Sequence, residues 1–408
     1  MGMTTRLGID DVRPLISAGS VASKAVVGEV IPVTALVWRE GHDAVSATLS
    51  AWAARSTATS SVTMQVDPKD QDRVHGVFTP GTQGTWYFRV DAWSDPIATW
   101  KNAVTKKMAA GQSAAELAND FQHGADLFSR AALQTPSDIV APLFAAARDL
   151  EDESLDVDKR VQVALSDEVT DILHSHPLRD LLVEGAIHEV YVERPAALYN
   201  SWYELFPRST GGWDKEGNPV HGTFDTTAQA LERVADMGFD TVYFPPIHPI
   251  GKVHRKGKNN SVVAEPGDVG SPWAIQDHST THPELGTIED FKKLVSRAEE
   301  LGLEVALDFA LQASPDHPWA TSHPEFFTVL PDGTIAYAEN PPKKYQDIYP
   351  LNFDNAPDAI YHEIYETLMI WVEAGVSTFR VDNPHTKPAN FWDWLITRVH
   401  ATLSLIHI

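Results

Sequence analysis

The 408-residue sequence predicts a multidomain chain in which a β-sandwich and a helical bundle precede an α/β TIM barrel that is cut off after about four βα units. Three features of the sequence predict this order. Short runs rich in β-branched residues come first, apolar residues at helical spacing follow, and strands and helices alternate from there on. The chain is also longer than one ordinary hydrophobic core encloses.

Residues 1–95 are expected to form an Ig-like β-sandwich. Residues 24–40 are rich in valine and other β-branched residues, and further short runs follow that are separated by glycine and proline turns. Short strands at this spacing are typical of an antiparallel sandwich.

Residues 96–184 are expected to form a bundle of about four helices. Apolar residues recur there at helical spacing, as at Leu117, Phe121 and Ala125. The plain interpretation is a packed bundle without chemistry, which could still supply a dimerisation surface.

Residues 185–408 are expected to form the N-terminal half of a (β/α)8 barrel, with long loop insertions at residues 245–286 and 311–357. Asp225 is expected to cap the first helix, and Thr287 with Asp290 forms a capping-box pattern for another helix. The expected strands are residues 202–206, 241–244, 304–310 and 377–382, and the later helices are residues 288–301 and 359–373.

The charge balance excludes polyanionic partners. Lys and Arg total 32 against 56 Asp and Glu, which gives a formal net charge of -24. Such a chain repels nucleic acid and anionic membrane surfaces but not a neutral carbohydrate. It has no cysteine, and so no disulfide or thiolate metal site. Without a signal-like or membrane-spanning run, we expect a cytoplasmic protein.

Two carboxylates follow apolar strands, where TIM barrels collect their reactive groups. These are Asp308 and Asp382. Arg380 lies two residues before Asp382, so both side chains should point to one face of the strand and the guanidinium should orient the carboxylate. A glycosyl nucleophile needs such a carboxylate. A structural ion pair at the strand end is the alternative.

Two loops at the same end of the expected barrel suit a binding site. The first holds a basic cluster, Lys252, His254, Arg255, Lys256 and Lys258, in an otherwise acidic chain. This cluster could hold an anionic part of a substrate, or it could be a solvated loop. The second loop, residues 336–354, combines prolines, amides and tyrosines, which favours an ordered wall over the barrel mouth.

Several of these segments resemble the α-amylase superfamily, glycoside hydrolase family 13. They are MGFDTVYFPPIHPIG, LDFALQ, YQDIYPLNFD and TFRVDN. The longer runs IHPIGKVHRKGKNN and AENPPKKYQDIYPLNFDN resemble, more specifically, the α-1,4-glucan:maltose-1-phosphate maltosyltransferases. The resemblance extends over residues 5–402.

The resemblance implies a retaining transferase that moves maltosyl units from α-maltose 1-phosphate to the non-reducing end of an α-1,4-glucan and releases phosphate. It implies no metal or cofactor, and a homodimer for the full-length protein. The implied site residues are Asp382 as nucleophile, Arg380 as its orienting partner, Asp308 and Gln312 around the donor sugar, Lys252, Asn340, Tyr345 and Asn383 at the phosphate, and His385 on the acceptor side.

The sequence departs from the family pattern at two places. Ala313 stands where most family 13 enzymes have a histidine. The general acid/base glutamate belongs after the fifth strand, so the resemblance implies that it is absent from a chain ending at Ile408 and that this chain alone is inactive. Residues 403–408 are interpreted as a translated sequencing adapter, with a genuine fifth strand as the alternative.

Two other functions stay open. One is a different family 13 activity, an α-glucan hydrolase or transglycosylase. The other is a non-catalytic fragment that binds glycan or oligomerises through the sandwich and the bundle. A TIM barrel unrelated to carbohydrates is disfavoured by the paired motifs.

Overall fold

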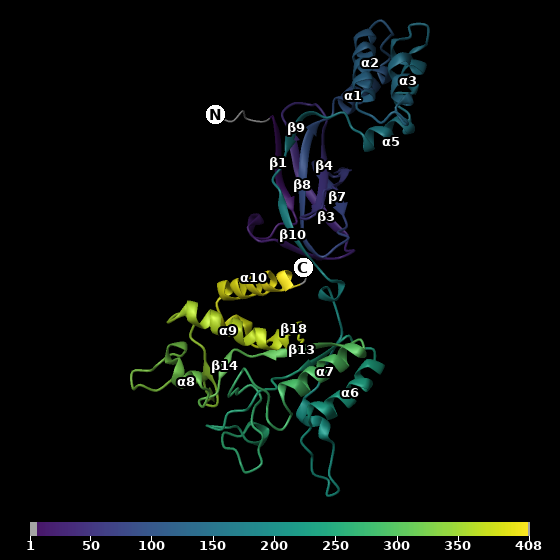
Figure 1. Cartoon of the computed structure of the whole chain (residues 1–408). Coiled ribbons are helices and arrows are strands. Elements are labelled where there is room, and N and C mark those ends of the chain that lie inside the picture. The colour runs from purple at the N-terminus through teal and green to yellow at the C-terminus, as the bar shows by residue number, and fades with distance from the viewer. Residues whose placement is uncertain (1–5, 407–408) are drawn as a thin grey trace. The chain divides into compact units, whose positions relative to one another are not determined.

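The computed structural model describes residues 6–406 (Figure 1). These residues divide into two compact units, with the boundary between Tyr199 and Asn200. Each unit has its own hydrophobic cores. No helix within the described range is long and apolar enough to cross a membrane.

The first unit contains two sheets, one in the order β1-β3-β7-β6 and one in the order β2-β10-β8-β4-β5, with β9 beside β8. Alternate residues of β3, such as Val33, Ala35 and Val37, are buried in the core that the two sheets share. The strands are β1 (Leu7–Arg13), β2 (Ser23–Val26), β3 (Ile31–Arg39), β4 (Val45–Ala53), β5 (Ser60–Thr63), β6 (Gln65–Asp67), β7 (Asp70–Phe78), β8 (Gly84–Ser94), β9 (Asp180–Glu184) and β10 (His188–Glu193).

Five helices connect β8 to β9 and have a core of their own (Figure 1). Asp95 caps the first helix, because its side chain accepts a hydrogen bond from the backbone N–H of Ala98 at 2.8 Å. Phe121 and Phe128 are fully buried in the bundle. The helices are α1 (Pro96–Ala109), α2 (Ala118–Ala132), α3 (Ala141–Glu151), α4 (Val157–Gln162) and α5 (Asp167–Ser175).

Strands β9 and β10 return the chain to the sandwich, whereas the sequence led us to begin the barrel region at residue 185. β10 pairs with β2 in parallel and with β8 in antiparallel orientation, and Val190 and Val192 enter the sandwich core. The helices are therefore an insertion within the sandwich. Local patterns do not show this, because the pairing joins strands on either side of residues 95–179.

The second unit is built on four parallel strands in the order β11-β12-β13-β18. Val305, Ala306 and Leu307 of β13 are all buried, as expected for a parallel strand covered on both faces. The strands are β11 (Trp202–Glu204), β12 (Thr241–Phe244), β13 (Glu304–Phe309) and β18 (Thr378–Val381), and the long helices are α6 (Phe224–Asp236), α7 (Ile288–Glu300), α9 (Pro357–Glu373) and α10 (Ala389–Ile406).

The long connection from β13 to α9 contains several short elements. Its β14 pairs with β17, and its β15 pairs with β16, both in antiparallel orientation. These elements are β14 (Gln312–Ala313), α8 (Trp319–Ser322), β15 (Ala338–Asn340), β16 (Lys343–Tyr345) and β17 (Tyr349–Pro350).

The helix caps agree with the sequence at α7 and differ at α6. Thr287 and Asp290 form the predicted capping box of α7. Helix α6 is capped by Thr223 with Thr226, so the assignment of the cap to Asp225 was wrong. Asp225 lies in the first turn, where a negative charge still favours the helix dipole.

The C-terminal segment is helical as far as it is described. Helix α10 continues to Ile406, so a fifth strand over residues 403–406 is excluded. Residues 407–408 lie outside the described residues. The adapter interpretation concerns the coding sequence and stays a hypothesis.

Candidate active site

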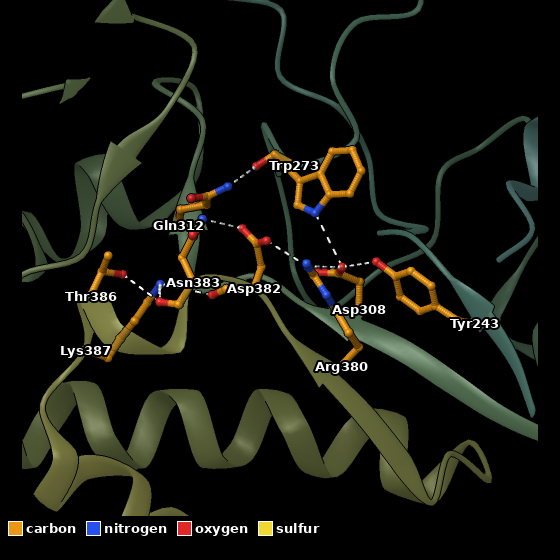
Figure 2. A network of polar contacts seen from close by, with 9 residues as sticks. All are labelled: Tyr243, Trp273, Asp308, Gln312, Arg380, Asp382, Asn383, Thr386 and Lys387. Carbon is orange, nitrogen blue, oxygen red and sulfur yellow. Dashed lines mark hydrogen bonds and ion pairs between the residues drawn. The ribbon is translucent and has the colours of Figure 1, made fainter. Parts of the chain in front are cut away.

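The ends of β13 and β18 bring two carboxylates to one arginine. The parallel register places Asp308 opposite Arg380. Nη1 of Arg380 donates to Oδ2 of Asp308 at 2.9 Å and to Oδ1 of Asp382 at 2.7 Å (Figure 2). The guanidinium therefore fixes both carboxylates relative to each other through charge-assisted hydrogen bonds.

Asp308 is fully buried at the centre of this network. Its Oδ2 also accepts hydrogen bonds from the hydroxyl of Tyr243 and, at 3.4 Å, from Nε1 of Trp273 (Figure 2). Burial raises the pKa of the Asp308 carboxyl to about 6, although these donors and Arg380 act in the opposite direction. Oδ1 of Asp308 is buried without a hydrogen-bond partner among the described residues, which makes it an acceptor suited to a ligand hydroxyl.

Asp382 is held at both carboxylate oxygens. Oδ1 faces Arg380, and Oδ2 accepts a hydrogen bond from Nδ2 of Asn383 at 3.0 Å. Asn383 adopts the left-handed backbone conformation, with φ 48°, which asparagine tolerates better than most residues. This turn after β18 directs the amide of Asn383 back toward the carboxylate (Figure 2).

Lys387 lies beside the same turn. Its Nζ is 3.5 Å from the backbone oxygen of Asp382 and 3.4 Å from that of Asn383. Burial lowers the pKa of the Lys387 ammonium to about 8, and the negative charge of Asp382 opposes this shift. The ammonium group of Lys387 therefore lies beside the backbone of the turn that carries Asp382.

An open pocket of about 640 Å³ contains most of the residues expected at the site. Its walls are formed by the loop between β12 and α7, the β13–α9 connection and the turn after β18. The side chain of Gln312 is oriented by a hydrogen bond from its Nε2 to the backbone oxygen of Trp273 at 3.1 Å. The expected residues that line the pocket are Gln312, Asn340, Tyr345, Asp382, Asn383 and His385.

The basic loop contributes Lys256 to this pocket. Lys256 is only 8% exposed and lines the pocket. Lys252 is exposed and is not among the lining residues, and only its backbone N–H is fixed, by Oδ2 of Asp316 at 3.0 Å. Between the two lysines, Arg255 donates to the backbone oxygens of Ile250 and Gly251, which anchors the loop so that Lys256 turns inward.

Four residues at the site were not singled out for these positions from the sequence. Tyr243 and Trp273 support Asp308, and Lys387 lies beside Asp382. Asp347 lines the pocket, and burial raises the pKa of its carboxyl. Tyr243 and Asp347 belong to segments that resemble the family, whereas Lys387 follows the last of these segments and had no signal in the sequence, because no periodicity marks a residue that supports another side chain.

One group of side chains in the described part of the chain could hold a metal ion. His221, His282 and Glu284 offer ligand atoms within 4.8 Å of one another. Burial lowers the pKa of His282, and the positive charges of Arg255 and Arg208 act in the same direction. Those charges also oppose a cation, so the group fits a metal poorly.

The chain matches two family descriptions. Residues 5–194 match "Alpha-1,4-glucan:maltose-1-phosphate maltosyltransferase, domain N/S", and residues 204–349 match "Alpha amylase, catalytic domain". The protein named alpha-1,4-glucan:maltose-1-phosphate maltosyltransferase from Corynebacterium pseudotuberculosis (strain 1002) is 62% identical over 404 residues, which are 98% of this chain. The chain belongs to this family.

Other maltosyltransferases give the same result. The protein of that name from Corynebacterium glutamicum is 61% identical over 406 residues, and that from Mycolicibacterium smegmatis is 56% identical over 424 residues. The chain spans about 60% of the length of these relatives. Among solved structures, an α-amylase from Lactobacillus plantarum is 32% identical, with a TM-score of 0.42 over 50% of this chain and 43% of that chain.

Proposed function

We propose that residues 1–408 supply the donor half of the active site of a retaining maltosyltransferase, which moves a maltosyl unit from α-maltose 1-phosphate to an α-1,4-glucan. The observation that carries this proposal is the arginine bridge, in which Arg380 orients Asp382 at the edge of the pocket while Asp308 offers a buried acceptor beside it. The family membership supplies the substrate class.

In the first step, a carboxylate oxygen of Asp382 attacks the anomeric carbon of the donor. The bond from that carbon to the phosphate oxygen breaks, phosphate takes the electron pair, and a maltosyl ester forms with inverted configuration. Phosphate is a good leaving group, so this step depends little on acid catalysis. Lys256, Asn340 and Tyr345 line the pocket with one cation and two neutral donors, which suits a phosphate dianion.

In the second step, the 4-hydroxyl of a glucan end attacks the anomeric carbon of the maltosyl ester. The bond from that carbon to the Asp382 oxygen breaks, Asp382 leaves as a carboxylate, and the original configuration is restored. This step needs a base roughly 5–5.5 Å from the nucleophile to take the hydroxyl proton. Asp308 is a poor candidate because its Oδ2 is committed to three donors. We propose that a glutamate outside residues 1–408 serves as this acid/base.

Two structural proposals accompany the reaction. The four parallel strands of the second unit would be the first half of a (β/α)8 barrel, completed in the longer relatives. The full-length protein would be a homodimer. The exposed apolar side chains of Leu133 and Phe144 on the helical bundle, 81% and 48% exposed, support an interface there.

The reaction is tested in a full-length enzyme that carries residues 1–408. We expect phosphate release from α-maltose 1-phosphate only when an α-1,4-glucan is added, and Asp382→Ala should lower this rate by at least about a thousandfold. A fluorinated maltosyl donor that stalls the intermediate should label the peptide that contains Asp382. Labelling of another side chain would refute the assignment.

A further inference from the structure

One tryptophan of the β-sandwich lies on the outside of its sheet. In β3 the odd-numbered residues from Ile31 to Val37 face the core, so Trp38 faces outward, and its side chain is 49% exposed. Strand β1 pairs with β3 and lies at the end of the sheet order (Figure 1). A large aromatic surface is thereby presented beside an edge strand.

The indole ring of Trp38 is fixed in place. Its cross-strand partner is Gly8, and the ring lies so close to it that a Cβ atom on Gly8 would be 2.4 Å from Cε2 of the indole. Nε1 of Trp38 donates to Oδ2 of Asp10 at 2.8 Å. Covering a strand glycine with an aromatic ring stabilises the strand pair. It also leaves a rigid, flat surface. Because the Trp38 side chain is already fixed in the free protein, a ligand that binds to it loses little affinity to side-chain conformational entropy.

An open groove of about 870 Å³ begins at this ring and runs beside β1. Carboxylates line it together with apolar residues, among them Asp10, Asp11, Glu40 and Glu184. Arginines hold three of these carboxylates in ion pairs, Arg13 with Asp11 at 3.0 Å, Arg89 with Glu184 at 2.9 Å, and Arg6 with Glu40. An ion-paired carboxylate keeps free lone pairs that accept hydrogen bonds from hydroxyl groups.

This combination fits a neutral polyol with flat faces. Arginines neutralise three of these carboxylates, so the lining carries no large charge that would favour an ionic ligand, and the aromatic surface favours a ligand with an apolar face and polar edges. A chain of pyranose rings has both properties. The C–H face of one ring can pack on the indole while hydroxyls of the next rings reach the carboxylates.

We propose that the groove beside β1, with Trp38 as its platform, is a second binding site for the α-glucan chain. The identity of the polymer rests on the proposed function. Holding a long acceptor at this site would raise its effective concentration at the catalytic pocket when the polymer is long enough to reach both. Short acceptors would gain nothing.

The full-length enzyme tests this by affinity electrophoresis in gels with and without glycogen, and by acceptor kinetics. We expect Trp38→Ala to lose most of the glycogen-dependent retardation and to raise the KM for glycogen about fivefold. The KM for maltotetraose and the kcat should not change. Glu40→Gln, which leaves the Trp38–Gly8 contact intact, should weaken glycogen binding in the same direction.

Val77→Ala is the matched control, because Val77 is 52% exposed on the adjoining β7 and does not line the groove. Unchanged glycogen binding in both Trp38→Ala and Glu40→Gln would overturn the proposal. It would also be overturned if Trp38→Ala changed the molar mass in solution but not glycogen binding, since the face would then join copies of the chain. Retardation of the protein by glycogen is measured without α-maltose 1-phosphate. It therefore tests glucan binding even if the proposed maltosyl transfer is wrong.

Discussion

At the residue scale, the site depends on which cation faces the pocket. A solvated lysine contributes little to binding a phosphate, whereas a buried one forms charge-assisted hydrogen bonds with it. Lys256 is buried in the pocket wall, and Lys252 is exposed on the same loop. The two lysines are four positions apart and carry the same charge, so they provide a matched pair for an experiment.

We expect Lys256→Ala in the full-length enzyme to lower kcat/KM for α-maltose 1-phosphate roughly 10- to 150-fold. This range corresponds to the loss of one hydrogen bond to a charged group, which contributes about 1.5–3 kcal/mol. Lys252→Ala should stay within about twofold. Initial rates of phosphate release at several donor concentrations provide both numbers. A larger loss of kcat/KM in Lys252→Ala than in Lys256→Ala would show that Lys252, not Lys256, contacts the phosphate.

The sequence predicted the partners of Asp382 better than the loop residues, for a physical reason. Residues two apart on a strand share a face, so the contact of Arg380 with Asp382 followed from spacing alone. The direction of Lys256 depends on how Arg255 anchors an irregular loop, and no periodic pattern encodes that. The same limit applies to Tyr243, whose role becomes visible only when β12 lies beside β13.

At the element scale, the start of helix α7 is determined by a capping box of neighbouring residues, and the helix then packs against the parallel sheet. Thr287 and Asp290 close its first turn, and Phe291, Leu294 and Ala298 then bury one face against the core that includes β12 and β13. Such a signal involves only neighbouring residues, so it is readable in the sequence. The pairing of β10 with β8 joins segments far apart in the chain, and it was missed for that reason.

We expect Thr287→Ala to lower the free energy of unfolding by about 1 kcal/mol, because the backbone N–H of Asp290 loses its acceptor at 3.3 Å. Thr287→Ser keeps the hydroxyl and serves as the control, with a loss of a few tenths of a kcal/mol at most. Urea unfolding followed by circular dichroism measures both. Equal losses in the two variants would show that the methyl group of Thr287, not the cap, stabilises α7.

At the scale of the whole molecule, three buried histidines join the two long loops behind the site. Nε2 of His278 donates to the backbone oxygen of Ala310 at 2.9 Å, so its Nδ1 is the acceptor for Nε2–H of His317 at 3.0 Å. Nδ1 of His317 in turn accepts from the backbone N–H of Trp319 at 3.1 Å. The acceptor nitrogens of His278 and His317 therefore both face an N–H group already. Protonating either ring would bring two N–H groups together and break a hydrogen bond.

His248 completes the cluster, and its Nδ1 donates to the backbone oxygen of Thr280 at 3.0 Å. Burial lowers the pKa of His248 to about 3, of His278 to about 4 and of His317 to about 2. The unfolded chain has histidine pKa values near 6.5. As the pH falls below about 6.5, the unfolded chain therefore binds protons at these histidines and the folded chain does not. The free energy of unfolding decreases until the pH reaches the pKa values of the folded chain.

Asp308 acts in the opposite direction in the same window. Its pKa of about 6 lies above the ordinary value of 3.8, so the folded chain takes up one proton as the pH falls from 6 toward 4, and this offsets one of the three histidines. We expect the contribution of these four groups to the free energy of unfolding to be constant above about pH 7. Below pH 6 it should fall with a net slope of about two protons, each contributing about 1.4 kcal/mol per pH unit.

Tryptophan fluorescence during urea unfolding at pH 5.0, 6.0 and 7.5 measures this slope. Two of the twelve tryptophans report on the cluster, because Trp371 packs on His248 and Trp319 stacks on His278. His248→Gln keeps a donor for the backbone oxygen of Thr280 but cannot be protonated, so it should remove about half of the net slope. His42→Gln, at an exposed position of the sandwich, should leave the slope unchanged. If the three buried histidines instead have pKa values near 6.5 in the folded chain, only the shift of Asp308 will remain, and the free energy of unfolding will rise rather than fall from pH 7.5 to 5.0 in all three proteins.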